Sequence, residues 1–271
     1  MRILFLGDIV GHPGKQMVEQ WVPKLIKHFQ PDITIANAEN IAPNGRGLTE
    51  RLAEALFDVE VDILTLGNHA FDHKESLPLI STDRRIVRPA NYPAGTPGQG
   101  YTLCRAGNSQ IAIINLLGRA FLGDYDDPFR TADRILEEIG DKTKHIFLDI
   151  HAEATSEKAA LANYLAGRVS AVVGTHTHVQ TADERILAGG TAFLTDVGMC
   201  GPYDSIIGFH KDGVIQKFLT QMPSRFEVPQ GEAQLHGVYI ETNDLGKAVS
   251  ISRISITPDR PWNTNSDLKQ F

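Results

Sequence analysis

The most constraining feature of the sequence is a pattern that recurs along the chain: a short apolar run, rich in Ile, Leu and Val, that stops at polar residues. The instances are RILFLGD to Asp8, DITIANAEN to Asn40, VDILTLGNH to His69, KHIFLDIHAE to Glu153, SAVVGTHTH to His178 and TAFLTDVGM to Met199. Continuous apolar runs of this length are typical of strands that are buried on both faces. The chain is therefore predicted to build sheets that are covered on both sides.

The segments between these runs are predicted to be helical, over residues 15–29, 49–59, 131–140 and 155–168. The candidate N-terminal caps are Thr49, Thr131 and either Thr155 or Ser156, and the candidate stops are Gly140 and Gly167. Pro23 is expected to kink the first of these helices or to divide it in two. Strands that alternate with helices indicate an α/β fold with mostly parallel neighbours.

Two segments depart from the alternation. Residues 100–118 are predicted to form a hairpin that turns near Gly107–Asn108, and residues 235–256 a second hairpin that turns near Asn243–Gly246. These hairpins suggest antiparallel additions to the sheet or a second sheet. The Pro/Gly-rich stretch 92–100 is a predicted surface loop that is too short to mark a domain boundary, so residues 1–271 are predicted to form a single domain.

Composition and charge narrow the class of protein. The formal net charge is −7 and there is no long basic run, which disfavours extended nucleic-acid binding. Cys104 and Cys200 are the only cysteines, so neither a disulfide framework nor a thiolate metal motif is expected. The N-terminal apolar run ends at Asp8, which is too early for a signal-peptide core, and no run reaches membrane-spanning length. The expected location is cytoplasmic, with no membrane partner.

The polar ends of the apolar runs indicate a metal site. Ligands of open α/β sheets bind outside the carboxyl ends of the strands. The residues predicted to lie there are Asp8, Glu39, Asn40, Asn68, His69, His151, Glu153, His176 and His178. Carboxylates, amide oxygens and imidazoles are all metal ligands. A lone histidine at such a position is often only a polar turn residue, but four of the ten histidines fall at these ends.

The pair His176 and His178 adds a spacing argument. Alternate side chains of an extended chain point the same way, so the two rings are expected to face one cavity.

The order of the polar motifs resembles a known superfamily. GD at 7–8, GNH at 67–69, the lone His151 and GTHTH at 174–178 resemble the calcineurin-like metallophosphoesterases. The longer segments LGDIVGHPG, NAENIAPNGRGLT, LGNHAFDHKE and GTHTHVQTADERI are most similar to the YmdB-like bacterial phosphodiesterases within it, across nearly the whole chain. The resemblance implies a four-layer α/β/β/α sandwich with mixed sheets, in which residues 1–271 are one metallophosphoesterase domain.

The sequence departs from the superfamily pattern at several positions. Val10 stands where a histidine ligand is usual and cannot bind a metal, and Ala70 replaces the acidic residue after GNH. Glu39 stands where the bridging Asp is usual, and Asn40 offers an amide oxygen in place of the lost imidazole. Because adjacent strand residues point to opposite faces, Glu39 and Asn40 can both be ligands only if the strand has ended before them.

The resemblance implies two divalent metal ions, with iron or manganese favoured and zinc or cobalt compatible with the ligand types. It assigns the first ion to Asp8, Glu39, Asn40 and His178, and the second to Glu39, Asn68, His151 and His176, with Glu39 bridging. The charges of two divalent ions exceed those of two carboxylates and a bridging hydroxide. The site would therefore keep a positive charge, which suits an anionic substrate.

The function implied by the resemblance is hydrolysis of small cyclic nucleotides, of which 2′,3′-cyclic nucleotides are the leading candidates. Attack would come from a metal-bridging hydroxide, with His69 as proton donor, although a structural role for this histidine is the alternative. Asn44 and Arg46, in the Gly-rich stretch after Asn40, are candidate phosphate contacts. Few aromatic residues and no basic groove are present, so weak base preference is expected.

Two other functions stay open. A 5′-nucleotidase-type phosphomonoesterase is one, although the sequence shows no large second domain to hold a nucleoside. A metal-bound regulatory protein that binds nucleotide or RNA is the other, and the acidic charge gives no support to RNA binding. The resemblance also suggests a homo-oligomer. Smaller roles are open for Glu153, which could orient His151 or simply be solvated, and for Asp196, which could touch the cleft or begin a loop.

Overall fold

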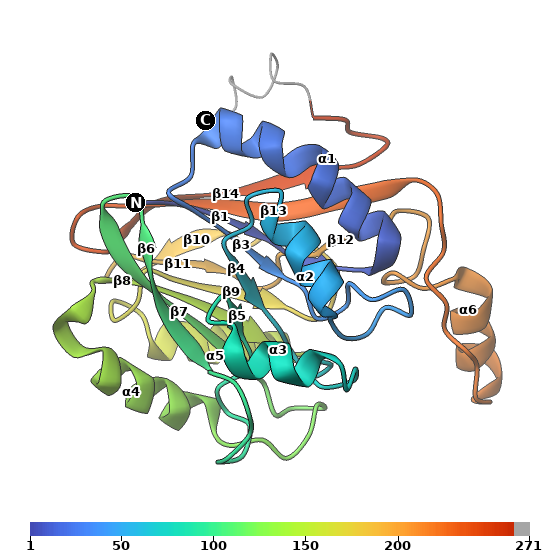
Figure 1. Ribbon diagram of the computed structural model, residues 1–271, viewed down its shortest axis with the longest axis horizontal. Coiled ribbons are helices and arrows are strands. Elements are labelled where there is room, and N and C mark those ends of the chain that lie inside the picture. The colour runs from blue at the N-terminus through green and yellow to red at the C-terminus, as the bar shows by residue number, and fades with distance from the viewer. Residues whose placement is uncertain (263–271) are drawn as a thin grey trace.

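The computed structural model describes residues 1–262 and contains two β-sheets packed face to face (Figure 1). The first sheet comprises β1 (Arg2–Leu6), β2 (Asp8–Ile9), β3 (Ile33–Asn37), β4 (Ile63–Thr65), β5 (Ile86–Val87), β12 (Met199–Pro202), β13 (Ala233–Thr242) and β14 (Ala248–Ile256). Its order is β2-β12-β13-β1-β3-β4-β5, and β14 pairs with β13. The neighbours β1, β3, β4 and β5 are parallel, whereas β13 is antiparallel to β1, β12 and β14.

The second sheet comprises β6 (Tyr101–Ala106), β7 (Ser109–Leu117), β8 (His145–His151), β9 (Ala171–Thr175), β10 (Arg185–Leu187) and β11 (Thr191–Leu194). Its order is β10-β11-β9-β8-β7-β6. The four central strands are parallel and the two edge strands are antiparallel. Both sheets are therefore mixed, as the resemblance implied, and both predicted hairpins are present, as β6–β7 and β13–β14.

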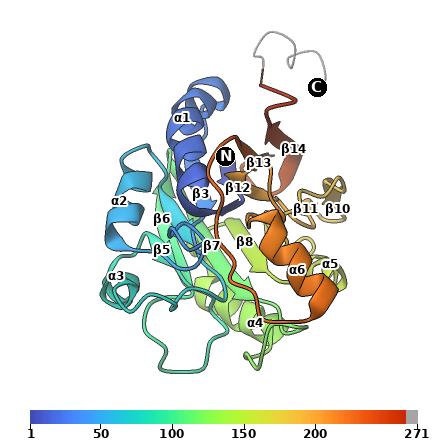
Figure 2. The ribbon, with the colours of Figure 1, turned by 90° about the vertical axis from the view of Figure 1, so that its right-hand side faces the viewer.

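Helices cover the outer face of each sheet. Residues of α1 (Gly11–Phe29), α2 (Glu50–Phe57) and α3 (Ser76–Thr82) pack on the first sheet, and residues of α4 (Pro128–Ile139) and α5 (Thr155–Tyr164) pack on the second. Figure 2 shows α2 and α3 on one side of the two sheets and α5 on the other. The sixth helix, α6 (Lys211–Thr220), stands at one end of the molecule (Figure 1). The predicted α/β/β/α order of four layers is confirmed.

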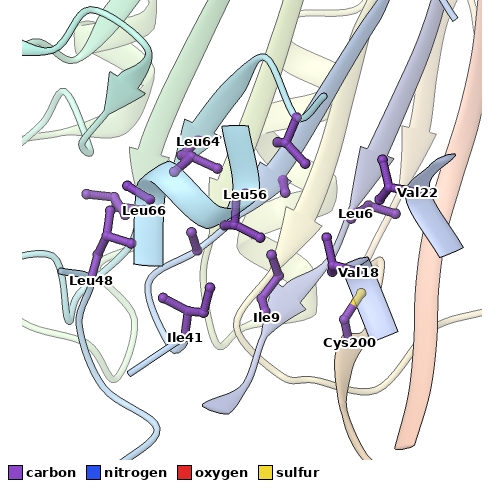
Figure 3. Packing of buried hydrophobic residues seen from close by; sticks show 14 of the residues in the cluster. Leu6, Ile9, Val18, Val22, Ile41, Leu48, Leu56, Leu64, Leu66 and Cys200 are labelled. Carbon is purple, nitrogen blue, oxygen red and sulfur yellow. The ribbon is translucent and has the colours of Figure 1, made fainter. Parts of the chain in front are cut away.

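Each interface between layers has its own apolar core. The core between the first sheet and its helices contains Leu6 of β1, Val18 and Val22 of α1, and Leu56 of α2 (Figure 3). A second core fills the space between the two sheets, and a third lies between the second sheet and helices α4 and α5. The parallel strands β3, β8 and β9 are thus buried on both faces, which explains the continuous apolar runs in the sequence.

The helix boundaries differ from the sequence expectations in informative ways. Helix α4 begins at Pro128 rather than after Thr131, because the carboxylate of Asp127 accepts hydrogen bonds from the amides of Phe129 and Arg130. Helix α1 begins at Gly11 and continues through Pro23, so the chain is not divided there. Helix α5 has Ala154 at its N-cap, and the predicted side-chain cap does not form. Among these three helices, only α4 begins at a side-chain cap.

The layer between the two sheets changes character along the strands. Four strands carry an apolar residue followed two positions later by a polar one on the same face: Ile35 and Asn37, Ile63 and Thr65, Phe147 and Asp149, and Val173 and Thr175. All four polar residues are fully buried. We call the part of this layer around Ile35, Ile63, Phe147 and Val173 the apolar half. We call the part formed by Asn37, Thr65, Asp149 and Thr175 the polar half. The polar half lies at the carboxyl ends of the parallel strands.

No helix in residues 1–262 combines the length and the apolar character needed to cross a membrane.

Candidate metal centre

A carboxylate links the two sheets within the polar half. Asp149 Oδ2 accepts hydrogen bonds from Thr65 Oγ1 at 2.6 Å and from Asn37 Nδ2 at 3.1 Å, both on the first sheet. Its Oδ1 accepts the hydroxyl of Thr175 at 2.7 Å. Burial raises the pKa of Asp149 to about 6, against the lowering effect of His151 and of these hydrogen bonds. The carboxyl group is thus satisfied by its neighbours and supports the residues above it.

This network fixes the tautomer of His151. Because the Thr175 hydroxyl donates its hydrogen to Asp149, its oxygen accepts from His151 Nδ1, which lies 2.9 Å away. The hydrogen on Nδ1 leaves a lone pair on Nε2 of the neutral ring. A histidine ligand commonly has its second nitrogen held in this way. The polar half therefore presents the Nε2 atom of His151 as a ligand.

Three further acceptor atoms converge on that nitrogen. His151 Nε2 lies 2.9 Å from Glu39 Oε1, 3.0 Å from His176 Nδ1 and 3.1 Å from Asn68 Oδ1. A single proton on Nε2 could bond only one of these three atoms. Glu39, His151 and His176 also form a group whose ligand atoms lie within 4.8 Å of one another. A cation would satisfy all four atoms together, so the donor set fits a divalent metal ion.

A second set of buried oxygens lies next to this group. Within residues 1–262, Asp8 Oδ1 and Asn40 Oδ1 are buried and have no hydrogen-bond partner. Asn40 Nδ2 donates to the Gly45 carbonyl at 2.9 Å, which fixes the orientation of the amide. His178 Nδ1 lies 2.8 Å from the Ile207 carbonyl, so the ring can keep a lone pair on Nε2. Unpartnered buried oxygens are costly, and a bound cation would relieve that cost.

The electrostatics of the centre favour ionised Glu39. Burial opposes ionisation of this carboxyl group, but His151 and His69 lower its pKa to about 2. Burial also opposes the charged form of His151, and here Glu39 and Asp8 raise the pKa to about 9. Burial and the neighbouring His151 lower the pKa of His176 to about 3. Glu39 thus favours the charged form of His151, and a cation bound at this nitrogen would compete with the proton.

The backbone allows Glu39 and Asn40 to face the same site. Strand β3 ends at Asn37, and residues 39–40 lie in a turn, which meets the condition set by the sequence. The Asn40 carbonyl accepts from Gly11 N at 2.9 Å, and the Glu39 carbonyl accepts from Gly47 N. The turn is therefore held on both sides.

The expectation for the histidine pair needs a correction. Strand β9 ends at Thr175, and His176 and His178 have φ angles of 100° and 64°, so they do not lie in extended chain. Alternation along a strand therefore does not place these rings. A turn with two left-handed residues does so instead, and His176 N donates to Asp8 Oδ2 at 3.1 Å.

His69 is joined to the centre through its backbone. Its amide donates to Glu39 Oε2 at 2.8 Å, and its Nδ1 lies 2.8 Å from Asp72 Oδ2. The side chain of His69 is 24% exposed. The sequence pattern does not mark Asp72, and its spacing of three residues from His69 is the one signal that points to it. The ring is thus held through its Nδ1 and is partly accessible.

The remaining candidates lie around this centre. Asn44 and Arg46 are exposed on the loop that closes on Asn40, and Asn44 Oδ1 accepts from the Arg46 amide at 3.2 Å. Glu153 does not orient His151, because its Oε2 lies 3.2 Å from Nε2 of the other histidine, His176. The roles of the loop residues as substrate contacts stay a prediction.

The chain matches a known family and a known protein over most of its length. The family described as "YmdB-like protein" matches residues 4–254. A relative from Bacillus subtilis, named 2′,3′-cyclic-nucleotide 2′-phosphodiesterase, is 52% identical over 260 residues, which are 96% of this chain and 98% of the relative.

Solved structures have the same fold. A crystal structure of a hypothetical protein from Thermus thermophilus has a TM-score of 0.90 at 44% identity, covering 95% of this chain and 99% of that one. A crystal structure described as a novel phosphatase, from Mycoplasma pneumoniae, has a TM-score of 0.89 at 34% identity, covering 95% and 93%. The similarity extends over nearly the full length of all three proteins.

Proposed function

The chain belongs to the YmdB-like family and is an enzyme of the phosphodiesterase class, and we propose that it hydrolyses 2′,3′-cyclic nucleotides at a centre of two divalent metal ions. The observation that carries the proposal is the convergence of Glu39, Asn68 and His176 on His151 Nε2, beside the unpartnered oxygens of Asp8 and Asn40. The name of the Bacillus subtilis relative supports the choice of substrate.

In this proposal the ligands divide into two groups that share Glu39. Asp8, Asn40 and His178 would hold the first ion, and Asn68, His151 and His176 would hold the second. When bound, the ions would activate water as the nucleophile and neutralise charge on the phosphate oxygens. Iron and manganese suit this mixture of imidazole and oxygen ligands.

His69 would donate the proton that the leaving oxygen needs. The leaving group of a cyclic diester is a ribose hydroxyl, which departs poorly without protonation. Asp72 holds Nδ1 of His69, so Nε2 is the nitrogen available for the transfer. The hydrogen bond that the backbone amide of His69 donates to Glu39 Oε2 fixes this residue relative to the shared ligand. The same carboxylate thereby sets the position of both the metal ligands and the acid.

Recognition in this proposal depends on phosphate and ribose. Asn44 and Arg46 would contact the phosphate from the loop that closes on Asn40, and base preference would be weak. We also propose that residues 1–271 act as one domain and that the chain forms a homo-oligomer in the cytoplasm.

A substrate panel tests the proposal. Protein supplied with manganese should open 2′,3′-cyclic nucleotides to nucleoside 3′-phosphates and then stop, while 3′,5′-cyclic nucleotides and 5′-monophosphates should react far more slowly. A chelator should abolish the activity, and restored manganese should return it. Preference for 5′-monophosphates, or release of inorganic phosphate from the cyclic substrate, would instead support a nucleotidase.

Metal analysis tests the shared ligand. The wild-type protein should contain two ions per chain, and Glu39→Ala should lose affinity for both. A Glu39→Ala protein that keeps two ions would overturn the bridging assignment.

A further inference from the structure

A buried ion pair lies beside the centre but contains none of the proposed ligands. Lys158 of α5 is fully buried, and its Nζ lies 2.6 Å from Asp196 Oδ2, on the segment after β11. The side chains of the pair are 0% and 1% exposed. Removing a lysine and an aspartate from water is costly, and apolar residues of similar volume often stabilise a fold equally well. The pair therefore points to a role other than stability.

The Asp196 carboxylate connects two segments that carry proposed ligands. Its Oδ2 accepts the amide of Thr177 at 3.1 Å, and Thr177 lies between His176 and His178. Its Oδ1 accepts the amide of Gly198 at 2.9 Å. The Gly198 carbonyl in turn accepts the amide of Asp8 at 3.1 Å. One carboxylate thus sets the histidine turn relative to Asp8.

The histidine turn needs such support. His176 and His178 both have positive φ angles, a conformation that residues other than glycine adopt at a cost. An amide donated to a carboxylate inside this turn favours the strained backbone.

Lys158 completes the support in two ways. Its ammonium group neutralises the buried carboxylate, which would otherwise place an uncompensated negative charge near the site. Its stem packs against Gly174, two residues before His176: a Cβ added at Gly174 would lie 2.7 Å from Lys158 Cδ and 1.8 Å from the Thr195 carbonyl oxygen. The glycine of the GTHTH motif therefore makes room for the lysine and for the neighbouring strand.

We propose that the Lys158–Asp196 ion pair is a positioning device that sets the distance between Asp8 and the histidine turn, and thereby the affinity of the first metal ion. The inference rests on the proposed function, because it takes Asp8, His176 and His178 as metal ligands. Lys158 and Asp196 lie outside the proposed ligand set. Asp196 holds the backbone at Thr177 and Gly198, and the pair as a whole carries no net charge.

Manganese binding to the full chain tests the inference. The variants are Lys158→Met, Asp196→Asn and the double variant, each stripped with chelator and titrated with Mn²⁺. Electron paramagnetic resonance reports the affinity and distinguishes paired from single manganese ions. Denaturant unfolding of the metal-free proteins reports the stability separately. Leu161→Ala is the matched control, because Leu161 is buried on the same helix α5 but packs in the apolar core between the second sheet and helices α4 and α5.

The double variant, which leaves the net charge unchanged, should bind one of the two ions about 10–100-fold more weakly, the usual effect of losing a residue that orients a ligand. The paired-manganese signal should give way to that of single ions. The double variant should unfold at higher denaturant than either single variant, because it keeps no lone buried charge, yet its affinity should stay low. Leu161→Ala should unfold more easily while its folded fraction binds both ions as the wild type does.

Two outcomes separate the inference from its premise. Wild-type affinity for both ions in the double variant would overturn the positioning role and leave the proposed function standing. Failure of the wild-type chain to bind two manganese ions would overturn the proposed function and the inference with it.

Discussion

The two halves of the layer between the sheets share the same strands and the same burial but differ in what holds them together. In the apolar half, Phe5 and Phe147 pack with their ring centroids 5.1 Å apart, and the contact has no directional requirement beyond shape. In the polar half, Asp149 receives hydrogen bonds from both sheets, and each bond requires its donor in place. One half therefore supplies stability and the other supplies orientation.

The comparison shows how a sheet can place a site. Along β8 the inward side chains pass from Phe147 to Asp149 to His151, so a single strand runs from core to supporting network to ligand. Because every second side chain of a strand faces the same side, neighbouring members of this series are only two residues apart. We therefore expect substitutions in the apolar half to lower stability and substitutions in or above the polar half to lower metal binding or turnover.

The largest effect is expected at His69, at the open end of the polar half. His69→Ala should lower turnover of a 2′,3′-cyclic nucleotide by about 10²–10⁴-fold, the usual contribution of a general acid. Metal content and the free energy of unfolding should change little. Steady-state kinetics should also show a much smaller loss with a nitrophenyl ester, whose leaving group needs no proton. Equal losses with both substrates would rule out the proton-donor role.

Phe147→Ala should have the opposite profile. Loss of this ring from the apolar half should lower the free energy of unfolding by about 3–5 kcal/mol, because a cavity replaces a buried aromatic side chain. Denaturant unfolding measures the loss, and turnover per folded molecule should match the wild type. The control is Phe193→Ala, in the apolar core between the second sheet and helices α4 and α5. It should also lower the free energy of unfolding and leave turnover per folded molecule unchanged. A fall in turnover that occurs in Phe147→Ala but not in Phe193→Ala would contradict the assignment of stability alone to the apolar half.

Thr175→Val tests the polar half directly. The substitution removes the hydroxyl between His151 and Asp149, so the ring loses the acceptor that fixes its tautomer. Metal affinity should fall by about 10–100-fold, as measured by manganese titration. The control is Thr191→Val, whose buried hydroxyl donates to the Val169 carbonyl away from the centre. If both variants bind metal equally well, the network has no orienting role.

The smallest effect concerns pH. His236 of β13 lies at the polar end of the layer, two residues before Val238 of the apolar half, and burial lowers its pKa from 6.5 to about 4. Asp196 opposes this shift and Arg253 adds to it. The unfolded chain binds the proton more readily, so stability is complete above pH 6.5 and falls as pH drops toward 4.

The expected loss between pH 7 and 4.5 is about 1–2 kcal/mol, after allowance for partial exposure. Denaturant unfolding of chelator-treated protein measures it, and His236→Gln should flatten the pH dependence. Burial also lowers the pKa of His145. This residue is present in both proteins, so it contributes equally to the pH dependence of each. An unchanged slope in His236→Gln would assign the effect to another group.

Local signals in the sequence were sufficient for much of this arrangement. The hairpin turns near Gly107–Asn108 and Asn243–Gly246 depend on residues next to each other, and both were predicted. The polar ends of the apolar runs marked the ligand candidates because strands ending at one edge bring their ends together. The start of α4 also has a local signal, the cap Asp127 followed by Pro128, which competes in the sequence with the candidate cap Thr131.

Other features depend on pairings between distant segments, which one sequence does not show. Asp149 lies inside an apolar run and looks like an interruption until Thr65 and Thr175 are placed beside it. Lys158 looks like a solvated residue of an amphipathic helix until Asp196 is placed beneath it. The insertion of β13 between β12 and β1 likewise has no local signature.

That insertion has a consequence for the order of synthesis. Every proposed ligand precedes residue 179, yet the Gly7 amide, next to Asp8, is held by the His236 carbonyl of β13, and β12 reaches β1 only through that strand. A nascent chain therefore leaves the ribosome with a full set of ligand side chains before it has the strand that closes their sheet. We therefore expect a ribosome-stalled fragment that ends before β13 to carry every proposed ligand without the strand that completes the first sheet, and to bind metal more weakly than the full chain.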